Sequence, residues 1–154
     1  MNFNDFIKQG KVKKGEKDKA LVKSLLQTVH QDLKFLDSIE INDLSARKIM
    51  SNYYDVLRAV VEAIATLDGF KVYSHEAFTY YLKENKNEEL HSLKFDRFRK
   101  IRNKLNYYGK NISVEEVLAN ILEIKQMIND LIGKYLEKNN NYINKNNQNI
   151  KKHS

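Results

Sequence analysis

The chain of 154 residues has no cysteine, no proline and no tryptophan, and it has only five glycines. Without cysteine it can form neither a disulfide framework nor a thiolate that attacks a substrate or binds zinc. Proline and glycine mark turns and irregular connections, so their scarcity favours a chain made mostly of helices. The composition alone therefore predicts an all-α fold.

The sequence also lacks long apolar runs. No stretch of about 18 apolar residues is present, which argues against a transmembrane helix, and the N-terminal residues lack the apolar segment of a secretory signal. Hydrophobic residues make up 42% of the chain and charged residues 31%, a balance typical of one globular domain. We expect a cytoplasmic protein that makes no contact with a membrane.

Positive charge is plentiful and unevenly placed. The net charge is +7, yet residues 8–23, 93–110 and 138–154 carry +5, +6 and +4, so the rest of the chain carries −8. Such clustering is typical of proteins that bind a polyanion, most often a nucleic acid. A solvated lysine-rich surface without a partner would give the same composition, and both interpretations remain open.

Apolar residues recur at three- to four-residue steps along most of the chain, which predicts amphipathic helices. Ser113 and Glu116 form a capping-box pattern before the last helix, Asn42 or Asp43 can cap the second, and Gly69 and Gly109 follow two helix ends. The predicted helices cover residues 17–36, about 43–67, 74–82, 88–108 and 113–135. Short links favour antiparallel neighbours, so we expect an up-and-down bundle of four long helices and one short helix.

Three regions follow from this pattern. Residues 1–15 are expected to form a flexible basic lead-in, and residues 16–137 form the helical bundle. Residues 138–154 contain seven asparagines and no periodic apolar pattern, which predicts a disordered tail.

The segment 95–109 has the most unusual chemistry of the chain. At 100° per residue, Phe98, Ile101, Leu105 and Tyr108 share one helix face, and we expect that face to pack into the bundle.

A second set of side chains, Arg99, Arg102 and Asn106, lies at the edge of that face. Two guanidinium groups and an amide in one row suit phosphate binding, because arginine presents a planar fork of donors to phosphate oxygens.

The pair Arg102–Asn103, followed by an aromatic pair and a glycine, resembles the signature helix of HEPN domains. The motif of that family is an arginine, usually a polar residue after it, and a histidine four to six residues later. The second predicted helix also resembles the family, with Tyr53, Arg58, Glu62 and Ala63 before Gly69. The Ser74–His75 pair then opens the next helix as in the family, and the resemblance covers roughly residues 17–137.

The resemblance implies an all-α HEPN-like bundle that forms a side-by-side homodimer, with the two motif helices facing each other across a cleft. Many HEPN proteins are metal-independent endoribonucleases that use no cofactor. Their arginine holds the scissile phosphate, which would assign that role to Arg102. Others are toxins of toxin–antitoxin systems and are controlled by a minimal nucleotidyltransferase partner.

The sequence departs from the family at the histidine. Tyr107 occupies that position, and no histidine lies between His91 and His153. A tyrosine with a pKa near 10 is a poorer general base at neutral pH than an imidazole with a pKa near 6.5. Two interpretations follow: a metal-independent endoribonuclease with Arg102 and Tyr107 as catalytic residues, or a non-catalytic dimeric module that binds a nucleotide or a nucleotidyltransferase partner.

For the RNA-binding interpretation the candidate phosphate contacts are Arg99, Arg102, Asn103 and Asn106. Structural alternatives stay open for two of them: Arg102 can form a salt bridge to an acid on a neighbouring helix or on the dimer partner, and Asn103 can stabilise its own helix or the dimer partner. Tyr107 and Tyr108 can stack on bases or pack at the end of the bundle.

The histidines give no sign of a metal site. His75, beside Ser74 at a helix start, could enter the cleft, but we expect it to cap its helix or to pack. His30 and His91 have no second histidine or carboxylate at a spacing that suggests a metal site, so no metal is expected.

Overall fold

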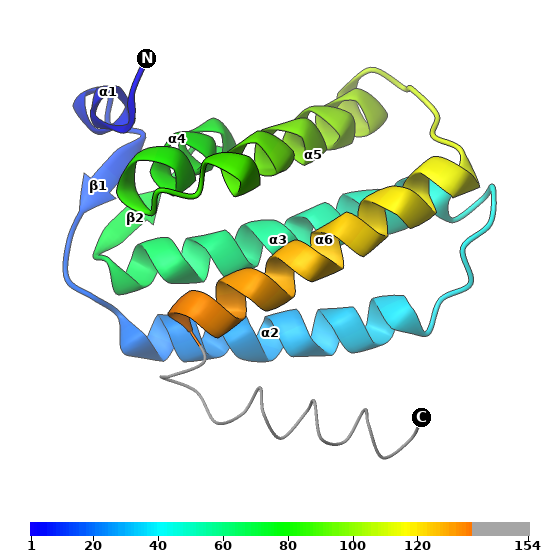
Figure 1. Cartoon of the computed structure of the whole chain (residues 1–154), viewed down its shortest axis with the longest axis horizontal. Coiled ribbons are helices and arrows are strands. Elements are labelled where there is room, and N and C mark those ends of the chain that lie inside the picture. The colour runs from blue at the N-terminus through cyan, green and yellow to red at the C-terminus, as the bar shows by residue number, and fades with distance from the viewer. Residues whose placement is uncertain (137–154) are drawn as a thin grey trace.

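A computed structural model describes residues 1–136 (Figure 1). The expected disordered tail, residues 138–154, and the last residue of the expected bundle lie outside the described residues. Within the described residues the fold is mostly helical, as predicted, with six helices and two short strands. The elements are α1 (Phe3–Lys8), β1 (Val12–Lys14), α2 (Lys19–Asp37), α3 (Ala46–Leu67), β2 (Phe70–Val72), α4 (His75–Asn85), α5 (Glu89–Tyr107) and α6 (Val114–Tyr135).

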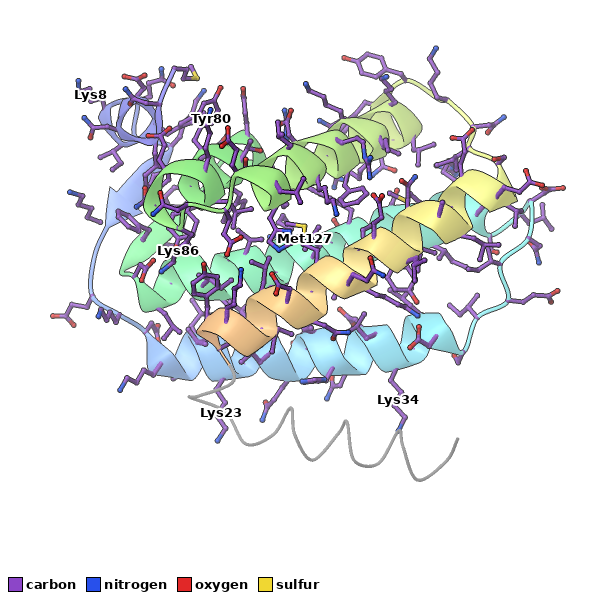
Figure 2. The ribbon with its side chains drawn as sticks, viewed as in Figure 1. Lys8, Lys23, Lys34, Tyr80, Lys86 and Met127 are labelled. Carbon is purple, nitrogen blue, oxygen red and sulfur yellow. The ribbon has the colours of Figure 1, made fainter. Side chains whose placement is uncertain are left out.

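Helix α3 is the centre of the bundle. It packs against α2, α6, α5 and α4, and Figure 1 shows α6 crossing in front of it with α2 and α5 on either side. Apolar side chains on nearly every face of α3 are buried, which is expected of a helix surrounded by others. The side chain of Met127 on α6 points into this core, whereas Lys23 and Lys34 on α2 point away from it (Figure 2).

The N-terminal segment is ordered, so the expectation of a flexible lead-in over residues 1–15 is wrong. Asn2 and Asp5 form a reciprocal capping box at the start of α1, and the Phe3 amide donates to Glu84 of α4 at 3.2 Å. Phe6 is 1% exposed and its ring lies 5.3 Å from that of Tyr80, beside α1 in Figure 2.

The two strands were not predicted either. Strand β1 pairs antiparallel with β2, with Val12 opposite Val72. The pairing joins segments that are far apart in the sequence. Lysines surround Val12, so this segment shows no local apolar pattern that would predict a buried strand.

Gly69 ends α3, as predicted, and its backbone has a φ of +86° that other residues rarely adopt. The Gly15 amide donates to the Gly69 carbonyl at 2.7 Å. A Cβ at Gly69 would lie 2.6 Å from the Gly15 oxygen. The close approach of these two glycines is what allows β1 to lie against the end of α3.

The helix starts agree with the sequence in part. Ser113 caps α6, because its hydroxyl accepts from the Glu116 amide at 3.1 Å. The second predicted cap is displaced: α3 begins at Ala46, after Ser45. The Asn42 side chain instead accepts from the amides of Leu44 and Ser45, at 2.9 and 3.1 Å, and forms the turn before the helix.

None of the helices within residues 1–136 has both the length and the apolar character needed to cross a bilayer.

Candidate nucleic-acid interface

The C-terminal half of α5 carries the candidate site, at the upper right of Figure 1. Phe98 and Leu105 face the core, as predicted, and Ile101 is partly buried against it. Tyr108 does not face the core: its side chain is 74% exposed, so the expectation that it packs into the bundle is wrong. Helix α5 ends at Tyr107, and Tyr108 takes a non-helical φ of −115°, which removes it from the periodicity that predicted burial.

Arg102 is largely buried, with its side chain 17% exposed. Its Nη1 donates to the Tyr107 hydroxyl at 3.3 Å and to Asn103 Oδ1 at 3.5 Å. Its guanidinium lies 5.8 Å from the centre of the Tyr54 ring and 5.7 Å from that of Tyr107. The structure therefore brings three of the predicted residues, Arg102, Asn103 and Tyr107, into contact.

The hydrogen-bonding capacity of Arg102 is only partly used. Its Nε is buried and has no hydrogen-bond partner among the described residues. Its one acidic neighbour in the described part of the chain is Asp55 of α3, 3.9 Å from Nη2. Burial raises the pKa of Asp55, although the nearby Arg102 and Arg58 act in the opposite direction.

Arg99 differs from Arg102 because its guanidinium is held within its own helix. Its Nη2 and Nε donate to Asp96 Oδ1 at 2.8 and 3.2 Å. Burial acts to raise the pKa of Asp96, but hydrogen bonds from Arg99 and Lys100 hold it below its usual value. The carboxylate is therefore ionised at neutral pH and neutralises Arg99.

Asn106 also has an internal partner, since its Oδ1 accepts from the Ser51 hydroxyl on α3 at 3.0 Å. Of the four predicted phosphate contacts, Arg99 and Asn106 are thus engaged by other side chains of the fold, whereas Arg102 and Asn103 lie together beside Tyr107.

A polar cluster beneath α5 was not anticipated from the sequence. The Tyr54 hydroxyl lies 3.2 Å from His75 Nδ1, at the start of α4. Burial, and after it the positive charges of Arg58, Arg102 and Arg99 in that order, together lower the pKa of His75 to about 4. His75 is therefore neutral at pH 7, and its Nδ1 can accept from the buried Tyr54 hydroxyl.

The three arginines around this cluster are unequally neutralised. Arg58 pairs with Glu62 at 3.0 Å and Arg99 with Asp96 at 2.8 Å. Arg102 has only the 3.9 Å approach to Asp55. Coulomb attraction falls with distance, so the charge of Arg102 is the least offset of the three. Arg102 therefore attracts an external anion most strongly.

An open hollow lies on the surface of α5, beside Asn103 and Tyr107, the two residues that Arg102 contacts. It has a volume of about 300 Å³ and its lining residues are Lys100, Asn103, Lys104, Tyr107 and Tyr108. We call these five residues the α5 hollow. They comprise two cations, an amide and two aromatic rings, with no acidic residue.

His91 has acidic neighbours that the sequence argument missed. Glu88 lies one turn earlier, with its Oε2 3.9 Å from His91 Nε2, and Asp130 of α6 approaches the same nitrogen to 2.6 Å. The Lys134 ammonium lies 3.0 Å from Glu88 and 3.5 Å from Asp130, so its single positive charge is shared between the two carboxylates. These contacts tie α5 to α6, and Asp130 could not be paired with His91 from sequence spacing.

We compared the chain with known families and structures. No family model, curated protein or solved structure matches it. We therefore take the function from the geometry at the C-terminal end of α5.

Proposed function

We propose that this protein binds RNA through the C-terminal end of α5, as a HEPN-like helical bundle in which Arg102 holds a backbone phosphate. The observation that carries the proposal is the state of Arg102. Its guanidinium is fixed by Tyr107 and Asn103, its Nε has no partner among the described residues, and its nearest carboxylate is 3.9 Å away.

The surroundings of Arg102 suit a polyanion. Lys100 and Lys104 line the adjacent hollow, and residues 93–110 carry a net charge of +6. Phosphates neutralised by lysine and arginine release condensed counterions, which supplies much of the affinity of such surfaces for nucleic acids. A guanidinium held in place before the ligand arrives loses less side-chain entropy when it binds a phosphate.

The same geometry is compatible with metal-independent RNA cleavage. In that reaction the 2′-oxygen attacks the neighbouring phosphorus and forms a cyclic phosphate, while the bond from phosphorus to the 5′-oxygen breaks. The 2′-hydroxyl loses its proton to water, and the leaving 5′-oxygen must gain one. Arg102 would stabilise the charge that develops on the phosphate oxygens. Tyr107, whose hydroxyl contacts Arg102, would donate the proton to the 5′-oxygen and regain one from water.

The proposal is tested by incubating a mixed RNA pool with the protein and with Arg102→Ala, in EDTA, and measuring both retention on a filter and new RNA ends. We expect the wild type to retain RNA and the variant to lose most of that retention. New ends that carry cyclic phosphate, formed by the wild type alone, would add endoribonuclease activity to binding. Equal retention by both proteins would contradict the proposal.

Exposed leucines support a second candidate, a dimeric interaction module. Leu90 and Leu93 on α5, and Leu118 and Leu122 on α6, are each more than half exposed. Each pair is three or four residues apart and therefore lies on one side of its helix. Adjacent exposed leucines are typical of surfaces that meet another protein.

In this candidate function the leucines meet a second copy of the chain, or a nucleotidyltransferase partner in a toxin–antitoxin setting. The double substitution Leu118→Glu and Leu122→Glu should convert a dimer into a monomer, as measured by light scattering during size-exclusion chromatography. A wild type that is monomeric at high concentration would count against the homodimer.

A further inference from the structure

We propose that the α5 hollow binds single-stranded RNA by stacking unpaired bases on the rings of Tyr107 and Tyr108. This inference rests on the proposed function and names the form of RNA that the site takes.

The two rings are unusually open for their size. The Tyr107 side chain is 69% exposed and that of Tyr108 is 74% exposed. Both line the hollow, together with Lys100, Asn103 and Lys104. Covering the exposed apolar surface of these rings with a flat apolar surface stabilises the complex, and a nucleobase is such a surface.

The Tyr107 ring is held in place before a ligand arrives. Its hydroxyl accepts from Arg102 Nη1 at 3.3 Å, and the guanidinium lies 5.7 Å from the ring centre. Arg102 is itself packed against the buried Tyr54. A ring restrained in this way loses little side-chain entropy on stacking, which favours binding.

The charge of the hollow selects a nucleic acid over a second copy of this chain. Asp96 lies 3.0 Å from the Lys100 ammonium and partly offsets its charge, so Lys104 carries most of the positive charge of the hollow. In a symmetric dimer the same surface patch meets itself, so Lys104 would face a patch of the same sign. That arrangement brings like charges together, whereas the phosphates of an RNA strand neutralise them. Aromatic rings beside lysines form the combination that proteins use to bind unpaired strands.

A preference for single strands follows from the geometry. In a duplex the bases stack on each other and cannot reach the tyrosines, so a duplex would gain only the phosphate contacts. Besides the two tyrosine hydroxyls, the side chains that line the hollow offer only Asn103 and the two lysines to read base edges, so we expect weak sequence preference.

The test compares two fluorescein-labelled RNAs of about twelve nucleotides. One is oligouridine and the other has the same sugar–phosphate backbone without bases, and anisotropy gives the dissociation constant of each. We expect the wild type to bind oligouridine at least about fivefold more tightly than the abasic strand. Tyr107→Leu and Tyr108→Leu should abolish that difference, whereas Tyr107→Phe and Tyr108→Phe, which keep the rings, should preserve it.

The outcomes separate this inference from the proposed function. Equal affinity of the wild type for both strands, together with weaker binding by Arg102→Ala, would overturn base stacking and leave phosphate binding intact. Loss of the difference in the phenylalanine variants as well as the leucine variants would also overturn it, because the hydroxyls would then be responsible. No binding of either strand would overturn both proposals.

Discussion

His75 gives the protein a predictable sensitivity to acid. The pKa of its imidazole is about 4 in the folded protein, first because of burial and then because of the arginines around it, against 6.5 for the unfolded chain. The unfolded chain therefore binds more protons between these two values, and the free energy of unfolding falls as the pH drops through that range.

The size of this effect follows from the two pKa values. Above pH 7 the imidazole is neutral in both states and contributes almost nothing. At pH 5 the difference in proton binding corresponds to about 2 kcal/mol, and solvent screening at a half-buried site reduces this to about 1 to 2 kcal/mol. Asn at this position keeps a hydrogen-bond acceptor for Tyr54 but has no proton to bind.

Urea denaturation of the wild type and His75→Asn at pH 7.5 and pH 5 measures this contribution. Between pH 7.5 and pH 5 the free energy of unfolding should fall by about 1 to 2 kcal/mol more in the wild type than in the variant. Parallel losses in the two proteins, or an NMR titration of His75 with an ordinary midpoint, would refute the proposed environment of the imidazole.

Two further predictions concern the N-terminal segment and the end of α3. Gly69→Ala should lower the free energy of unfolding by about 2 kcal/mol or more, because the new Cβ meets the Gly15 oxygen at 2.6 Å and φ is +86°. Gly109→Ala, where φ is +61° and no atom lies within 4 Å of the new Cβ, should cost only about 1 kcal/mol, and equal losses would contradict the close approach. Phe6→Ala should cost about 3 kcal/mol or more in urea denaturation, because the ring is 1% exposed, whereas a change below about 0.5 kcal/mol would indicate that α1 does not pack on the bundle.

Local patterns predicted the long helices because each one repeats its own apolar spacing. The cap at Ser113 was also predictable, since the residues that make it lie three apart. The pairing of β1 with β2 was not, because it depends on a contact between distant segments that no local pattern contains. Phe3 and Phe6 were missed for the same reason: they are buried only because α4 and β2 lie beside them.

The candidate site was predicted in outline from α5 alone. Arg102, Asn103 and Tyr107 do lie together, because the long Arg102 side chain reaches both the next residue and Tyr107 at the end of the same helix. The difference between Arg99 and Arg102 depends on which carboxylate each reaches, and the Asp55 that approaches Arg102 belongs to α3. The contact of His75 with Tyr54 could not be predicted from local patterns, since the two residues come from different helices.

The most direct measurement compares Arg102→Gln with Arg97→Gln for binding to a labelled single-stranded RNA at fixed salt. Both substitutions remove one positive charge from α5, but Arg97 is half exposed, is paired with Glu123 and does not line the hollow. We predict that Arg102→Gln raises the dissociation constant about tenfold or more, and that Arg97→Gln raises it less than about threefold. Equal effects of the two substitutions would show that the RNA responds only to net charge and would contradict a phosphate site at Arg102.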